Sequence, residues 1–78
     1  MKANNGNAVL HLKRGTELYL YGAYPLIVVQ DIIIPASPML NRKVQIPCTD
    51  ILAYGDPQAE KDYLIYIPAG DLTQEKTK

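Results

Sequence analysis

The sequence predicts a small all-β domain, and three observations lead to that fold class. Helical periodicity is hard to find along the 78 residues, whereas runs rich in β-branched residues and tyrosine recur between Gly, Pro, Asn and Asp. Five or six such runs follow one another at roughly ten-residue spacing, which is typical of a small antiparallel barrel or curled sheet. With one cysteine and one histidine, the chain lacks the residues for a disulfide or a usual structural zinc site. A dense hydrophobic core or a partner chain must therefore hold the fold.

The first two strands are expected to form a hairpin over residues 8–21. Apolar and polar residues alternate on both sides of Arg14-Gly15, a dipeptide that suits a tight turn. In the second strand, Tyr19 and Tyr21 share one face. The predicted hairpin would place its two strands side by side in one sheet.

The next segment, residues 24–34, is the most apolar of the chain. Its alternation breaks down, so apolar side chains point to both faces, and such a strand requires cover on two sides. A bend near Gln30-Asp31 would divide the segment into two strands. Two prolines then predict an irregular connection over residues 35–41.

Alternation resumes over residues 42–48 and predicts a fourth or fifth strand. Val44, Ile46 and Cys48 face inward in this pattern, while the residues between them face outward. Pro47 is expected either to end regular pairing or to mark an edge strand, because proline has no N–H to donate.

Residues 49–54 allow two interpretations. The strand either continues to Tyr54, which we favour, or Thr49-Asp50 caps a single helical turn. A turn is expected at residues 55–57, followed by a short helical turn over residues 57–61. Residues 63–67 form the last predicted strand, which is again apolar on both faces.

The whole prediction is a five- to six-stranded antiparallel barrel or curled sheet, of the size of SH3-like or OB-like barrels, with at most one short helical turn. Residues 1–6 are expected to be a flexible N-terminus, residues 7–71 a single domain and residues 72–78 a flexible tail. No apolar stretch approaches the ~20 residues of a membrane helix, and the N-terminus lacks the pattern of a secretory signal. We therefore expect a cytoplasmic protein without a membrane partner.

The charges exclude the footprint of a general nucleic-acid or anionic-membrane binder. Eight basic and eight acidic residues cancel. The distribution is uneven, since residues 1–43 carry five basic and two acidic residues and residues 44–78 carry three and six, which is +3 against −3. This asymmetry could orient one subunit against another, or it is an ordinary solvated surface.

No catalytic, cofactor-binding or metal-ligating constellation is predicted. Cys48, His11 and Asp50 are the residue types of a thiol nucleophile, its base and its orienter, but Cys48 falls in the inward register of its strand. The acidic residues lack a calcium-loop spacing, and the isolated glycines form no phosphate-binding motif. An enzyme centred on Cys48 is the weakest of three functional hypotheses, and no cofactor is expected.

The leading hypothesis is a non-catalytic homo-oligomeric β-module that acts as a protein-binding or structural accessory protein. The apolar faces of residues 24–34 and 63–67 require cover that so short a chain does not supply, and a second copy is the commonest source of it. Six tyrosines without Phe or Trp suit a protein-binding surface, although strands favour tyrosine in any case. The candidate interaction residues are Tyr19, Tyr21, Tyr24, Ile27, Val29, Ile33 and Tyr66.

The alternative is a small-barrel protein that binds single-stranded nucleic acid. Exposed tyrosines would stack on bases beside a local basic groove, and this requires the basic residues to converge in the fold. The candidate contacts are Lys13, Arg14, Arg42 and Lys43. Small β-rich chains are also common among accessory proteins of phages and mobile elements, which is an association with size and fold class only.

Overall fold

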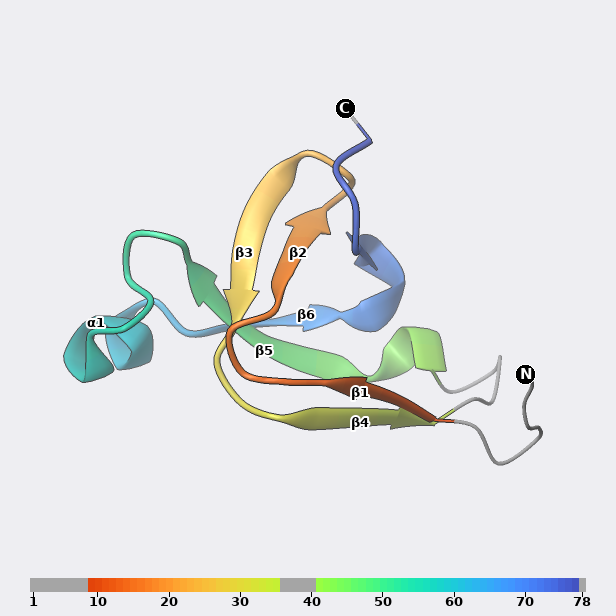
Figure 1. Ribbon diagram of the computed structural model, residues 1–78, viewed down its shortest axis with the longest axis horizontal. Coiled ribbons are helices and arrows are strands. Elements are labelled where there is room, and N and C mark those ends of the chain that lie inside the picture. Colours follow the sequence, from red (N-terminus) through yellow and green to blue (C-terminus); the bar gives the residue numbers. More distant parts are fainter. Residues whose placement is uncertain (1–8, 36–40, 78) are drawn as a thin grey trace.

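The computed structural model describes residues 9–35 and 41–77, which form two antiparallel sheets (Figure 1). A two-stranded ribbon pairs β1 (Val9–Leu12) with β4 (Ile32–Pro35). A five-stranded sheet in the order β6-β5-β3-β2-β7 curls into a half-barrel beside it. Its strands are β2 (Glu17–Leu20), β3 (Tyr24–Val28), β5 (Gln45–Asp50), β6 (Ile65–Pro68) and β7 (Leu72–Thr73). The predicted fold class, a small all-β curled sheet, is confirmed.

The ribbon and the centre of the sheet are two parts of one long, bent hairpin. Leu12 lies opposite Ile32 in the ribbon, and five residues further along each arm Glu17 lies opposite Ile27 in the sheet, so one register runs through both. The hairpin closes at the turn between β2 and β3, where Tyr21 (φ 53°) and Gly22 (φ 73°) both adopt the left-handed backbone. β1 through β4 therefore form a single unit of consecutive sequence.

The predicted hairpin over residues 8–21 is wrong. β1 pairs with β4, and β2 pairs with β3. The turn at Gly15 (φ 95°) does form, since the Thr16 N–H donates to the Lys13 carbonyl, but the Gly15 N–H donates to the Val28 carbonyl of β3. The backbone N–H of Gly15 thus bonds to β3 and not across the turn. The chain changes direction at Gly15, and β1 and β2 do not pair.

The bend predicted near Gln30-Asp31 is confirmed, because β3 ends at Val28 and β4 begins at Ile32. Asp31 fixes this bend to the corner of the other arm, where its carboxylate accepts the Arg14 N–H at 2.8 Å.

β5 has the predicted inward residues but passes through Pro47. Ile46 and Cys48 are fully buried. Pro47 lies opposite Tyr66 within the ladder, and its carbonyl accepts the Val29 N–H at 3.0 Å. The N–H and C=O of one strand residue point to the same side, so the missing N–H of Pro47 faces Val29, whose carbonyl instead accepts a hydrogen bond from the Arg14 guanidinium at 2.9 Å. The expectation that Pro47 ends pairing or marks an edge is wrong.

The favoured extension of β5 to Tyr54 is also wrong, because the strand ends at Asp50. The Asp50 carboxylate accepts the Leu52 N–H at 2.9 Å, and its carbonyl accepts the Ala53 N–H at 3.0 Å. These bonds close a turn over residues 51–55, so the alternative of an Asp-capped turn describes this segment better.

The expected short helical turn is confirmed as α1 (Pro57–Asp62). Its N-cap Asp56 accepts the N–H groups of Gln58 and Ala59 at 3.0 and 3.3 Å. The Tyr63 N–H donates to the Ala59 carbonyl and ends the helix. β6 consequently starts at Ile65, two residues later than the predicted strand.

Two 3-10 turns flank the β5–β6 pair, η1 (Asn41–Lys43) before β5 and η2 (Ala69–Asp71) after β6. β7 follows η2 and pairs with β2, with Leu72 opposite Leu20. Leu72 and Thr73, which were predicted to belong to a flexible tail over residues 72–78, thus form a strand. The predicted flexible N-terminus over residues 1–6 lies outside the described residues. Of the irregular connection predicted over residues 35–41, Pro35 ends β4, Asn41 begins η1, and residues 36–40 lie outside the described residues.

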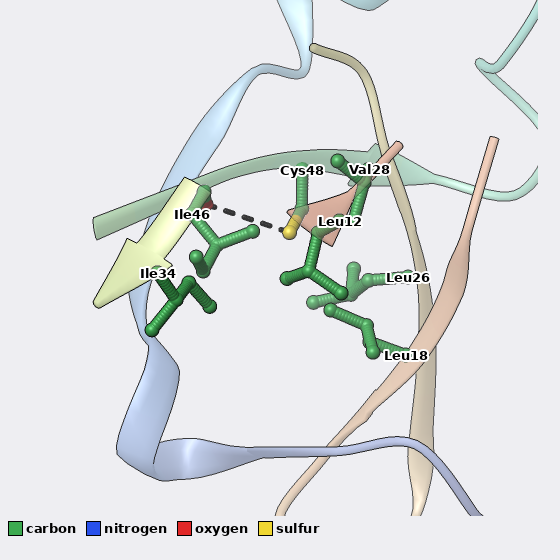
Figure 2. Packing of buried hydrophobic residues seen from close by; sticks show 7 residues of the cluster. All are labelled: Leu12, Leu18, Leu26, Val28, Ile34, Ile46 and Cys48. Carbon is green, nitrogen blue, oxygen red and sulfur yellow. Dashed lines mark hydrogen bonds between the residues drawn. The ribbon is translucent and has the colours of Figure 1, made fainter. Parts of the chain in front are cut away.

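The core lies between the concave face of the half-barrel and the ribbon. Figure 2 shows side chains of five strands converging there. The buried cluster consists of Leu12, Leu18, Leu26, Val28, Ile34, Ile46 and Cys48. This core takes one face of each strand; on the other face Pro47 and Thr49 of β5 are buried as well, whereas Tyr66 of β6 and Ile33 of β4 are exposed.

Candidate interaction surface

The structure brings three of the seven predicted interaction residues to one face. Tyr19 on β2, Ile27 on β3 and Tyr66 on β6 alternate with residues of the core-facing side, so all three lie on the convex face of the five-stranded sheet. Tyr66 is 58% exposed, whereas Tyr19 and Ile27 are half-buried.

The other four predicted residues lie elsewhere. Tyr21 is in the β2–β3 turn, and Tyr24 lies on the opposite face of β3 from Ile27. Val29 follows the end of β3, and Ile33 belongs to the ribbon, where it is 59% exposed. The seven residues therefore do not form one patch.

A more exposed apolar surface lies along β6, at one edge of the five-stranded sheet. Leu52, in the turn after β5, is 94% exposed, and the four residues that lead into and begin β6 are between 37% and 64% exposed. We call this the β6 edge surface; it consists of Leu52, Tyr63, Leu64, Ile65 and Tyr66. β6 pairs with β5 on one side, and on its other side no strand follows in the part of the chain that the structure describes.

A hollow of about 320 Å³ joins the two parts of this surface. Leu52 and Tyr63 line it together with Asp50, Ala53 and Ala59. Leu52 and Tyr63, which precedes β6, are thus neighbours in space although ten residues lie between them in sequence.

The carboxylate in the hollow is held by donors of the protein itself. The N–H of Leu52 and the hydroxyl of Tyr24, at 2.9 Å each, both donate to Asp50 and lower its pKa from its ordinary value. The same hydrogen bond to the carboxylate raises the pKa of Tyr24. Asp50 serves here to shape the turn that presents Leu52.

Sequence reasoning missed Leu52 and undervalued residues 63–65. The signal was present, because Ile51-Leu52 directly follows Thr49-Asp50, a pair that favours a capped turn. Of two successive apolar residues in a strand, one points to the core; in a turn, both side chains can be exposed to solvent.

Arg14, one of the candidate nucleic-acid contacts, is committed to an ion pair. Its guanidinium makes two parallel hydrogen bonds to the Glu60 carboxylate of α1, at 2.7 and 2.8 Å. It also donates to the Val29 carbonyl at 2.9 Å and lies 4.8 Å from the centre of the Tyr54 ring. Arg14, together with the Gly55 N–H, lowers the pKa of Glu60 to about 2, and the hydrogen bond to Glu60 raises the pKa of Arg14.

The remaining basic candidates have other surroundings. Arg42 lies across Gly70 of η2, and its guanidinium approaches the Gly70 carbonyl at 3.5 Å. Lys43 is exposed beside it in η1, and Lys13 is exposed after β1. Figure 1 shows η1 and the β1–β2 corner at opposite ends of the ribbon. The four basic residues thus belong to two separate neighbourhoods.

Cys48 lies in the core, where its thiol donates to the Ile46 carbonyl at 3.4 Å (Figure 2). Burial raises the pKa of this thiol to about 11, so it stays protonated at neutral pH. His11 is exposed on β1, and among the described residues no hydrogen bond joins Cys48 to His11 or Asp50.

Comparison with protein families, curated proteins and solved structures finds no match to this chain. Within residues 9–35 and 41–77, no helix is long and apolar enough to cross a membrane. Over the same ranges, no group of three or more His, Cys, Asp or Glu side chains is placed to hold a metal ion.

Proposed function

We infer that the protein is a homo-oligomeric β-module without catalytic activity, which acts as a protein-binding or structural accessory protein. The observation that carries this proposal is the β6 edge surface. It is apolar, exposed, and lies on a strand whose outer side pairs with no other strand among the described residues.

The two edges of the five-stranded sheet differ in a way that favours pairing at β6. Soluble proteins shorten their edge strands or place charges on them to prevent edge-to-edge association. β7 is two residues long and is followed by Glu75 and Lys76. Residues 63–70, in contrast, carry no charge at all. The β6 edge therefore lacks the charges that follow the other edge, and Pro68 limits pairing only at its end.

A second copy of the chain is the partner that fits this edge best. Antiparallel pairing of β6 with β6 about a two-fold axis places the same apolar residues on both sides of the new ladder. The rings of Tyr63 and Tyr66 add contact area, and their hydroxyl groups can remain at the rim of the interface. Leu52 projects beside the strand and would add a further apolar contact.

The nucleic-acid alternative has less support. It requires a basic groove beside stacked tyrosines, but Arg14 is neutralised by Glu60 and Arg42 lies apart from it. A flat response of oligonucleotide binding to salt would remove the phosphate-contact form of this alternative altogether.

Sedimentation velocity on the wild type and two matched variants tests the proposal. Tyr66→Lys places a charge on the β6 edge, and we expect it to weaken self-association at least tenfold, as a buried unpaired charge does. Tyr21→Lys makes the same change at an equally exposed tyrosine in the β2–β3 turn, and it should leave the oligomer intact. A wild type that is monomeric at high micromolar concentration would contradict the proposal, and so would equal effects of the two variants.

A further inference from the structure

A second cavity, which shares no lining residue with the hollow beside Leu52, opens into the core of the half-barrel. It measures about 340 Å³. Leu12, Leu18, Ile34 and Ile46, all members of the buried cluster, line its apolar part. Arg42 and Gln74 are among its polar lining residues. The volume lies at the lower end of the range of small-molecule sites, which are mostly apolar with a few polar groups that fix orientation.

The charge of Arg42 has no acidic partner. Among the described residues, the one ion pair joins Arg14 to Glu60, and none involves Arg42. The positive charge of Arg42 is therefore not compensated there. Within the described residues the guanidinium makes a single hydrogen bond, to the Gly70 carbonyl, which is long at 3.5 Å and uses only one of its N–H donors. No acidic residue lines the cavity.

Glycine at position 70 allows this placement of the guanidinium. A Cβ atom on Gly70 would lie 3.1 Å from Cβ, Nε and Cζ of Arg42, which is closer than side chains normally pack. The side chain of Arg42 thus rests on the bare backbone of η2, next to residues that line the cavity.

We propose that this cavity binds a small amphipathic monocarboxylate, with its hydrocarbon part against the core residues and its carboxylate on Arg42. The guanidinium fork matches a carboxylate in geometry as well as in charge. The amide of Gln74 supplies a second donor. At roughly 30 Å³ for each water-sized group, the cavity holds about ten such groups, which is the size of a medium-chain carboxylate.

Isothermal titration calorimetry and amide NMR shifts with octanoate test this site on the full chain. We expect saturable binding, with the largest shifts at Leu12, Ile34 and Leu72, which line the cavity. 1-Octanol has the same hydrocarbon tail without the charge, and it should bind at least tenfold more weakly, since a charge-assisted hydrogen bond is lost.

Variants of Arg42 separate this site from a general affinity for hydrocarbon. Arg42→Gln should weaken octanoate binding about tenfold or more and leave the weak binding of 1-octanol unchanged, whereas Arg42→Lys should restore part of the affinity. Lys61→Gln removes one positive charge from an exposed residue of α1 that does not line the cavity, so it serves as the matched control and should bind octanoate as the wild type does. Absence of saturable binding, equal affinity for octanoate and 1-octanol, or an unchanged affinity in Arg42→Gln would each overturn the proposal. None of these results depends on the oligomeric state, which the β6 variants test.

Discussion

The ion pair between Arg14 and Glu60 joins parts of the chain that are 46 residues apart in sequence. Arg14 stands at the corner between β1 and β2, and Glu60 lies on α1. The Glu60 carboxylate is 12% exposed, and besides Arg14 it accepts the Gly55 N–H at 2.7 Å. One carboxylate therefore fixes the helix, the turn before it and the corner of the bent hairpin together.

Glu60→Gln is expected to destabilise the protein at neutral pH by an amount that disappears in acid. The pKa of Glu60 is about 2 in the folded protein and near 4.3 in an unfolded chain. A lowered folded-state pKa adds stability above the unfolded-state value, and this contribution is lost as the pH falls toward the folded-state value. Urea unfolding at pH 7, 4 and 2.5 should show a difference between wild type and variant that shrinks over this window.

Glu75→Gln is the matched control, because Glu75 makes no side-chain hydrogen bond within the described residues. Its unfolding midpoint should equal that of the wild type at all three pH values. If Glu60→Gln kept its full effect at pH 2.5, the carboxylate would not be the stabilising group.

At the scale of elements, α1 is too short to persist without support. A six-residue helix is marginal in water, and α1 buries no residue of its own. Its stability comes from the cap by Asp56, from Pro57 at the first position and from the link of Glu60 to Arg14. The helix positions Ala59 and Tyr63, which line the hollow beside Leu52.

Asp56→Ala should lower the free energy of unfolding by about 1 kcal/mol, because two N–H groups at the start of α1 lose their acceptor. Chemical denaturation followed by circular dichroism measures this loss. Asp56→Asn keeps an acceptor oxygen at the same place and should retain most of the stability. Equal losses in the two variants would show that the cap is not the cause.

The sequence predicted several elements well, because their signals are local. The break at Gln30-Asp31, the inward residues of β5 and the capped start of α1 follow from alternation and turn chemistry. The pairing of β1 was not predictable in this way. Alternation tells which residues share a face, but it does not tell which strand lies alongside, and Gly15 suits a corner as well as a hairpin.

The candidate surface was only partly predictable for a related reason. Tyr66 was identified from the two apolar faces of its strand. Leu52 was missed because its exposure depends on β5 ending at Asp50, and a strand continuing to Tyr54 fitted the same residues. β6 lies at the edge because of the order of the strands in the sheet, and this order depends on contacts between residues far apart in the sequence.

At the scale of the whole molecule, the C-terminal segment completes the half-barrel. β7 adds to the free side of β2, and Leu72 packs against the core cluster. The Thr77 N–H donates to the Gly22 carbonyl and brings the segment to the tip of the bent hairpin. Residues late in the chain thereby cover a strand that forms near its start.

A chain that ends at Asp71 should lose on the order of 1–2 kcal/mol of stability, because it lacks the apolar contact of Leu72 and the pairing with β2. A chain that ends at Thr73 keeps both and loses the hydrogen bonds from Thr77 to the Gly22 carbonyl and from the Thr73 hydroxyl to the Glu75 carbonyl, so its loss should be smaller. Thermal unfolding of the two truncations measures the difference. Equal midpoints would mean that β7 adds nothing to the fold.

The single register that runs through the bent hairpin also predicts the order in which the protein assembles. Every pairing from β1 to β4 lies within 27 consecutive residues and can close from the three-residue turn at Tyr21-Gly22-Ala23 outward. β5 and β6 can dock next, on the open side of β3. The contacts of the C-terminal segment with the bent hairpin, such as that of Tyr19 with Thr73 across 54 residues, close long loops at a high cost in entropy, so they form last. In kinetic experiments, substitutions in the hairpin should slow refolding, whereas substitutions in β7 should mainly speed unfolding.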